Sequence, residues 1–263
     1  MDWLLEWLGR KLAKYLSEVR PAGTQLATSP PEKLAGALRP GDVLLVEGNT
    51  RVSVAIKYLT QSTWSHSALY VGDVLRDKTA GAPAAGEEPK VLIEADMRAG
   101  VRGVPLGHFE GLHTRICRPV GLAPEDLKKV VDFAVQRIGE GYDMKNVFDL
   151  VRYLFPTPPV PARFRRRMIA LGSGDPTRAI CSTLIAEAFG AVRYPILPLY
   201  EHHVPGDDTA EAQAEILHIR HHSLYVPRDF DISPYFAIVK PNLEHGFDYR
   251  KLRWAEEAKK PGL

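Results

Sequence analysis

Cys181 has the surroundings of a reactive thiol. The segment 178–189 is Arg-Ala-Ile-Cys-Ser-Thr-Leu-Ile-Ala-Glu-Ala-Phe, and its apolar positions fall at helical spacing, which places Cys181 in the opening turn of a helix. Unpaired N–H groups and the positive end of the helix dipole favour a thiolate over a thiol at such a position. The competing interpretation is a small core residue, since free cysteines are often fully buried. The residues that accompany the cysteine must decide between the two.

His66 and Glu94 could be those companions. His66 opens a short apolar run, which predicts a histidine at the start of a strand. Glu94 lies inside the apolar run 90–96, where an unpaired carboxylate would be costly to bury. An imidazole that takes a proton from a thiol needs a third group to orient it, and we expect Glu94 to be that group. Asp96 lies two residues further on the same strand face and is the alternative.

Serine and metal chemistry are both disfavoured. Ser182 adjoins the cysteine but lacks a G-x-S-x-G elbow, which argues against a serine hydrolase. The segment 202–222 is rich in potential metal ligands, but its i, i+4 pair, His218 and His222, lacks the glutamate of an HExxH motif because residue 219 is Ile. We therefore expect no metal and no other cofactor. The region of about 200–223 is interpreted as an insertion that borders the site, and its role stays open.

The elements that must position these residues follow an α+β pattern. Strands are expected at 42–46, 66–71, 90–94 and 113–120, with β character again at 225–239. Helices are expected at 51–59, 124–138 and 143–155. A proline in the first turn, followed by two acids, begins the second of these helices. The sequence thus predicts a small antiparallel sheet packed against helices, with the helix of Cys181 lying over it.

The segment 1–19 is amphipathic. Its Leu, Tyr and Val side chains form one stripe, flanked by Trp3, Trp7 and basic residues. Such a helix can lie in a membrane interface or dock on the protein's own core. The segment is too charged for a secretory signal, and no later segment approaches membrane-spanning length. We expect a cytoplasmic protein, with peripheral membrane contact through residues 3–19 as the alternative.

Composition narrows the partners and the compartment. The chain has 263 residues, 45% hydrophobic and 25% charged, as is usual for globular domains, and its net charge of +2 is too small for a nucleic-acid footprint. Two cysteines exclude a multi-disulfide scaffold and fit a reducing compartment, and we interpret Cys117 as structural. We divide the chain into an N-terminal helix and linker (1–31), a catalytic domain (32–245) and a tail (246–263). The oligomeric state stays open.

Five short motifs, in the order in which they occur along the chain, resemble those of the permuted branch of the NlpC/P60 papain-like hydrolases, the YiiX/YebB-like group. This group shares its chain order with lecithin:retinol acyltransferase. In this branch the strand with the histidine precedes the helix with the cysteine. The resemblance covers roughly residues 38 to 240. The motifs are Gly41-Asp-Val-Leu-Leu-Val46, Trp64-Ser-His66, Ile93-Glu94-Ala95, Gly139 to Tyr142-Asp143, and Ile180-Cys181-Ser182.

The resemblance implies a circularly permuted papain-like fold and a thiol-dependent hydrolase or a related acyltransferase. Tyr142 matches the tyrosine of the family's G-x-x-Y-D segment, which implies an oxyanion or substrate-binding role, and Ser182 is assigned to the same group. We predict an amidase or peptidase that acts through a Cys181-His66-Glu94 triad and a thioester acyl-enzyme on a peptide, amide or lipid-like acyl substrate. The alternatives are a lipid-directed acyltransferase or lipid hydrolase at a membrane surface, and a non-catalytic binding module.

Overall fold

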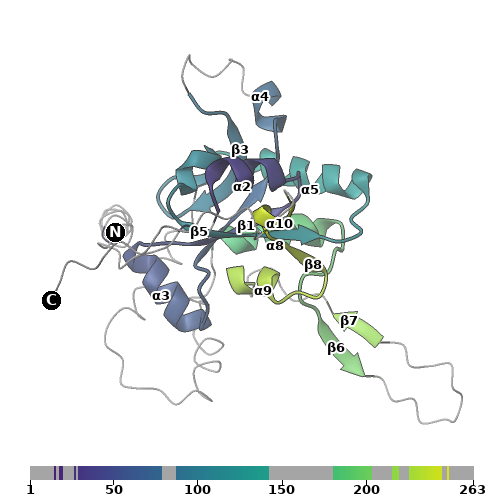
Figure 1. Ribbon diagram of the computed structural model, residues 1–263. Helices are drawn as coiled ribbons and strands as arrows, with labels where there is room; N and C mark the ends of the chain where they lie inside the picture. Colours follow the sequence, from purple (N-terminus) through teal and green to yellow (C-terminus); the bar gives the residue numbers. More distant parts are fainter. Residues whose placement is uncertain are drawn as a thin grey trace, which may run out of the picture.

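A six-stranded antiparallel sheet forms the centre of the molecule, with strand order β4-β3-β2-β1-β5-β8 (Figure 1). The structure is a computed structural model, and it describes residues 15, 18–19, 27, 29–78, 87–141, 180–202, 215–218, 225–244 and 248. The strands of the sheet are β1 (Val43–Glu47), β2 (His66–Tyr70), β3 (Lys90–Asp96), β4 (Gly100–Pro105), β5 (His113–Pro119) and β8 (Phe236–Val239). A second, two-stranded sheet pairs β6 (Leu199–His202) with β7 (Glu215–His218).

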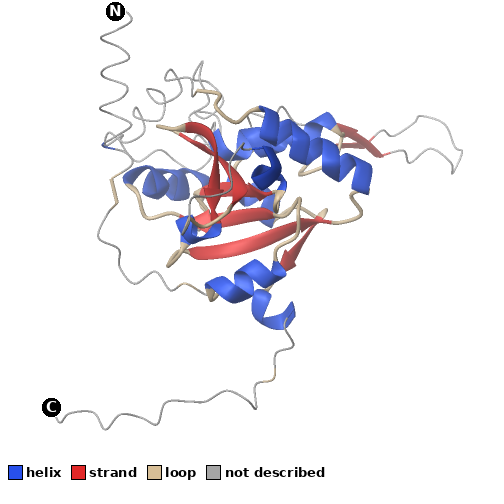
Figure 2. Cartoon of the chain, turned by 90° about the horizontal axis from the view of Figure 1, so that it is seen from above, coloured by secondary structure: helices blue, strands red, loops and turns tan. Residues whose placement is uncertain are grey.

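Helices cover both faces of the large sheet (Figure 2). The described helices are α2 (Pro31–Ala37), α3 (Arg51–Thr60), α4 (Val74–Lys78), η1 (Leu106–Phe109), α5 (Pro124–Gln136), α8 (Ile180–Ala191), α9 (Pro227–Asp231) and α10 (Pro241–Glu244). One hydrophobic cluster joins α5, α8 and α9 to one face. The other joins α2 and η1 to the opposite face. This cover explains why β1 is buried along almost its whole length rather than in alternation.

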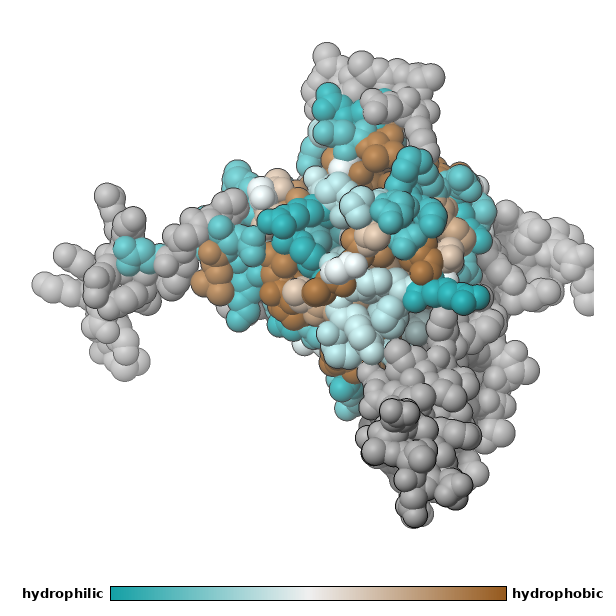
Figure 3. Space-filling view, turned by 90° about the vertical axis from the view of Figure 1, so that its right-hand side faces the viewer, coloured by the Kyte–Doolittle hydropathy of each residue, from teal (hydrophilic) through white to brown (hydrophobic). Residues whose placement is uncertain are grey.

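The alternation of side chains along each strand assigns residues to these two faces. Leu69 and Ile93 pack on the α5 and α8 side, whereas Ala68 and Leu92 pack on the α2 and η1 side. The surface in Figure 3 mixes hydrophobic and hydrophilic residues, as on most globular domains. No helix within the described ranges is both long enough and apolar enough to cross a membrane.

The predicted α+β class and its antiparallel sheet are confirmed. The range 225–239 was only partly right: Pro227 begins α9, the Asp229 carboxylate accepts the backbone N–H of Val226, and the strand starts only at residue 236. The sequence analysis also missed α2 and β4. The helix expected at 143–155 lies outside the described residues. The pair β6 and β7 falls in the expected insertion and extends from the body of the molecule (Figure 1).

Candidate active site

Cys181 is the second residue of α8, as the sequence predicted. Leu184, Ile185, Ala188 and Phe189 form the buried stripe that holds this helix against β2 and β3. The Cys181 side chain is buried and makes no disulfide. The helix therefore holds a free thiol at its positive end, directed at the centre of the sheet.

His66 and Glu94 lie together beside that thiol. His66 is the first residue of β2, Glu94 is in β3, and His66 Nε2 lies 2.6 Å from Glu94 Oε2. A second hydrogen bond joins the imidazole to the Cys181 thiol. Glu94 is only 3% exposed. The structure thus brings the three predicted residues into one chain of hydrogen bonds, Cys181 to His66 to Glu94.

Ser67 is a further neighbour of the sulfur, and it was not predicted. Strands β2 and β3 pair only at Leu69 with Ile93 and at Tyr70 with Leu92, so they separate toward the His66 end. The backbone N–H of Ser67 faces β3, because Val71 N, four residues on, donates to Val91 O. Instead of a β3 carbonyl, that N–H meets the Cys181 sulfur. The opening between the two strands is thus where α8 inserts its thiol.

The Ser67 hydroxyl also lies at the sulfur. It is fully buried, and among the described residues it has no hydrogen-bonding partner other than Cys181. A buried hydroxyl without an oxygen or nitrogen partner is unfavourable for folding alone. Its position suits a group that donates to a thiolate.

The surroundings favour an ion pair of thiolate and imidazolium. Burial alone would raise the pKa of Cys181, but the charge of His66 and hydrogen bonds from His66 and Ser67 outweigh burial, and the pKa lies below the ordinary thiol value. Burial alone would lower the pKa of His66, but Cys181 and Glu94 together raise it to about 10. The two groups titrate as a pair, so both directions describe one proton that the imidazole holds.

Glu94 is held on its other side by Arg102 of β4 and His108 of η1. Arg102 Nε and Nη2 lie 2.9 Å and 2.8 Å from Glu94 Oε1, and His108 Nε2 lies 3.4 Å from the same oxygen. Burial alone would raise the pKa of Glu94, but His66, His108 and Arg102 lower it to about 2. Arg102 is the direct cross-strand partner of Glu94. Arg102 was not predicted, because it reaches Glu94 only through the pairing of β3 with β4, and β4 was not predicted.

Asp96, the alternative to Glu94, serves the turn between β3 and β4. Its Oδ1 accepts the backbone N–H groups of Arg98 and Ala99, each at 2.8 Å. The carboxylate that contacts His66 is therefore that of Glu94.

Of the other residues that the sequence singled out, Ser182 and Cys117 make structural contacts, and Tyr142 is not among the described residues. The Ser182 hydroxyl is buried and donates to the Tyr225 carbonyl at 2.8 Å, which ties α8 to the chain before α9. Tyr142 lies outside the described residues. Cys117 is buried in β5, and burial raises the pKa of its thiol, in keeping with a structural residue.

The His-rich segment is described only in part. Its strands β6 and β7 are described, whereas residues 203–214 and 219–224 are not. Among the described residues, no three His, Cys, Asp or Glu side chains are grouped so that they could hold a metal ion.

Comparison with known proteins shows a similarity to one family over part of the chain. A family model described as "Permuted papain-like amidase enzyme, YaeF/YiiX, C92 family" matches residues 37–154, a range that includes His66 and Glu94 and ends before Cys181. The probable lipoprotein peptidase YaeF of Escherichia coli K12 is 24% identical over 179 residues, which cover 63% of this chain and 60% of that protein. A crystal structure titled metalloprotein YiiX, from Escherichia coli O157:H7, matches with 16% identity and a TM-score of 0.44, over 78% of this chain and 97% of that one. Residues 37–154 of this chain are thus similar to the YaeF/YiiX family of permuted papain-like amidases.

Proposed function

We propose that this protein is a thiol-dependent amide hydrolase in which Cys181 is the nucleophile, His66 the general acid and base, and Glu94 the group that orients His66. One observation carries the proposal: the Cys181 thiol at the start of α8 is hydrogen-bonded to an imidazole whose other nitrogen lies 2.6 Å from a buried carboxylate. Nucleophile, base and orienting acid are the three parts of a hydrolytic triad. Similarity to an amidase family over residues 37–154 supports the same chemistry.

The reaction follows from the positions of the protons. His66 holds the thiol proton, and the Cys181 thiolate attacks the carbonyl carbon of an amide to form a tetrahedral oxyanion. The backbone N–H of Cys181, at the positive end of α8, donates to this oxygen, and Tyr142 is proposed as a second donor. His66 then protonates the leaving amine as the C–N bond breaks, which leaves a thioester on Cys181. Finally, His66 deprotonates a water that attacks the thioester, and cleavage of the C–S bond releases the acid and restores the thiolate and imidazolium pair.

The substrate class that we propose is a peptide or another acylated amine. The name of the relative YaeF, a probable lipoprotein peptidase, supports a peptide substrate. The decisive experiment is mass spectrometry of the intact protein after rapid acid quench with a panel of acyl amides. A substrate should add the mass of its acyl group to the wild-type protein, and the Cys181→Ala protein should gain no such mass. An adduct that persists in Cys181→Ala would contradict the proposal.

The ion pair predicts the pH dependence of turnover. Because the pKa of Cys181 is lowered, the thiolate persists to pH values below the ordinary thiol pKa of 9.0. Because the pKa of His66 is raised to about 10, the imidazolium that protonates the leaving amine is lost only as pH rises through that value. We expect a bell-shaped profile of kcat/KM with its alkaline limb near 10. In His66→Ala, the pH profile of iodoacetamide alkylation should move up toward the ordinary thiol value, whereas an unmoved profile would argue against the pair.

Ser67 offers a test that separates thiolate stabilisation from folding. Ser67→Ala removes a hydroxyl that has no other partner in the described part of the chain, so the melting temperature should hold or rise, while alkylation of Cys181 at pH 7 should slow by about tenfold through loss of a charge-assisted hydrogen bond. Ser65→Ala is the matched control, because Ser65 Oγ accepts the backbone N–H of Gly48 at 2.9 Å. The control should lower the melting temperature and spare alkylation. The reverse pattern would remove Ser67 from the site.

A lipid-directed activity at a membrane surface is the second candidate, and exposed apolar residues favour it. Tyr15 and Val19 are 49% and 65% exposed, and Tyr58 of α3 is 61% exposed. Arg51, at the start of α3, contacts the Tyr15 ring with its guanidinium 4.1 Å from the ring centre, so these residues adjoin the amphipathic segment. The word lipoprotein in the name of YaeF supports a peripheral position as well. The predicted cytoplasmic location stays a prediction.

Vesicle binding tests this second candidate. Residues 1–14 lie outside the described residues, but their Trp side chains suit the headgroup region. If segment 3–19 binds membranes, replacing Trp3 and Trp7 by Ser should lower cosedimentation with anionic vesicles at least several-fold, and added salt should lower it further. Val120→Ser, at a site that is 60% exposed near the end of β5, is the control. An unchanged pellet fraction with a lower melting temperature would indicate that the segment docks on the protein itself.

A further inference from the structure

Strand β5 is longer than the strand that covers its edge. Strand β8 pairs with residues Ile116 to Pro119 of β5, and Ile116 lies opposite Val239. If the pairing continued in the same register, Thr114 would lie opposite residue 241 and form a hydrogen-bonded pair with it. Residue 241 is Pro, which has no N–H, and it begins α10. Strand β8 therefore ends at Val239, and among the described residues no further strand pairs with the first part of β5 on that side.

Thr114 presents its backbone polar groups to this uncovered edge. Val120 N donates to Tyr235 O, so the even-numbered residues of β5 turn their N–H and C=O groups toward β8. Within the described part of the chain, no backbone group pairs with Thr114 on that side. Thr114 as a residue is only 8% exposed, and it lines a recess at this edge. Buried backbone groups are nearly always paired with protein or with ordered water, so a ligand that offers backbone partners could gain hydrogen bonds here.

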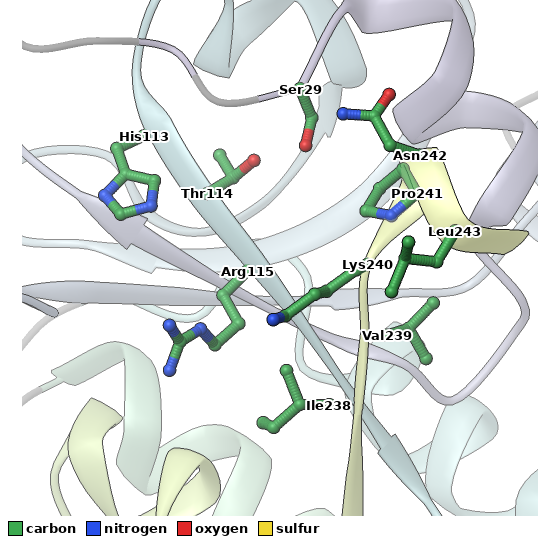
Figure 4. Close-up of a pocket in the computed structure, with 10 residues that line it drawn as sticks. All are labelled: Ser29, His113, Thr114, Arg115, Ile238, Val239, Lys240, Pro241, Asn242 and Leu243. Carbon is green, nitrogen blue, oxygen red and sulfur yellow. The ribbon is translucent and has the colours of Figure 1, made fainter. Parts of the chain in front are cut away.

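A groove of about 440 Å³ follows this edge (Figure 4). His113 and Arg115 border it from one face of β5 and Thr114 from the other, as expected for a groove that runs along a strand edge. Its volume is within the range of ligand sites. Apolar side chains from the end of β8 and from α10 form part of the wall: Ile238, Val239, Pro241 and Leu243. The polar residues Ser29 and Asn242 also line the groove (Figure 4).

The groove offers one positive side chain that has no acidic partner among the described residues. Arg115 is paired with Asp231, and His113 contacts Glu47, so each of these side chains already has an acidic partner. Lys240, by contrast, has no ion pair with any described residue, and its side chain points toward Arg115 (Figure 4). One unmatched positive charge therefore lies beside an open backbone edge and an apolar wall.

We infer that this groove binds an extended peptide segment that adds a short strand to β5 at Thr114 and places an acidic side chain against Lys240. Strand addition to an open edge is an established mode of peptide recognition, in which main-chain hydrogen bonds give affinity and side-chain pockets give specificity. A second copy of this chain is a poorer occupant, because only residues 113–115 are uncovered and β8 and α10 flank them. A flexible segment can enter such a recess, whereas the edge of a folded sheet cannot.

End-blocked pentapeptides test this inference on the full chain carrying Cys181→Ala, which prevents turnover. An array with Val, Thr, Ile or Leu at the four outer positions and Glu, Gln or Lys at the centre is measured by fluorescence polarisation. Members with Glu should bind tighter than the same members with Gln by up to roughly fivefold, the upper range for one partly exposed ion pair, and Lys members should bind least. Lys240→Glu should abolish the preference, whereas Lys128→Glu on the exposed surface of α5 should not.

Main-chain pairing is tested on the peptide, which leaves the protein intact. Backbone N-methylation at one residue should abolish binding and at the next residue should not, because alternate N–H groups face β5. Three results would overturn the inference: no member that binds below 1 mM, a preference that survives Lys240→Glu, or equal effects of methylation at both positions. Dimerisation lost in Lys240→Glu without peptide binding would instead assign the groove to a second copy. Because no turnover is measured, these results do not depend on the proposed hydrolase function.

Discussion

Replacing Cys181 by alanine should reduce amide hydrolysis by roughly 10⁴-fold or more, because the nucleophile is lost and only binding and oxyanion stabilisation remain. His66→Ala should cost a similar factor. The double variant should be hardly slower than either single variant, since residues of one catalytic unit are not additive. The measurement is kcat/KM on acyl amides identified by the acyl-enzyme adduct.

Cys117→Ala is the matched control for this loss. Cys117 is also a buried free cysteine, but it lies in β5, where burial raises the pKa of its thiol. We expect its removal to lower the melting temperature through a small cavity and to leave kcat/KM within a few-fold of wild type. Near wild-type turnover in purified Cys181→Ala would refute the thiol mechanism, and a large loss in Cys117→Ala alone would shift attention to β5.

The parts of the fold that the sequence predicted are those with a strong local signal. Pro124 followed by two acids marked the start of α5, and the helix ends at Gln136, two residues before the predicted end. The apolar runs marked β1, β2, β3 and β5 to within a few residues. Strand β4 has no such signal, because Gly100, Arg102 and Gly103 interrupt its apolar residues. It forms because the turn after Asp96 folds it back onto β3, a pairing that local periodicity does not encode.

The same limit applies to the candidate site. Residue type and helix position were enough to single out Cys181, and an acid in an apolar strand was enough to single out Glu94. Whether Glu94 or Asp96 faces His66 depended on geometry, because both lie on one strand face. Ser67 could not be found from the sequence, since its contact with the sulfur exists only where β2 and β3 separate. Local patterns nominate residues, whereas strand register decides which of them meet.

Glu94→Gln should lower kcat/KM by about 10²–10⁴-fold, the range for losing the group that orients a catalytic imidazole. The oxygen of a side-chain amide can accept a hydrogen bond from a histidine and orient it. The size of the loss therefore depends on what the other carboxylate oxygen of Glu94 does. Here both carboxylate oxygens accept hydrogen bonds, Oε2 from His66 and Oε1 from Arg102. An amide has only one acceptor oxygen, so its NH₂ group must face a donor, either Arg102 or His66. In a site that is 3% exposed, water cannot relieve that conflict.

Because of this conflict, replacing Arg102 should change kcat/KM in opposite directions in wild type and in Glu94→Gln. In wild type, Arg102→Met should lower kcat/KM, because Glu94 loses a partner that keeps it ionised and fixed. In Glu94→Gln, the same change removes the competing donor, so the amide oxygen can turn to His66 and kcat/KM should rise above that of Glu94→Gln alone. Arg98→Met, in the adjacent turn, and Asp96→Asn, a matched acid, should each leave kcat/KM within several-fold of wild type. A double-mutant cycle in which Arg102→Met lowers kcat/KM equally in both backgrounds would show that Arg102 does not act through Glu94.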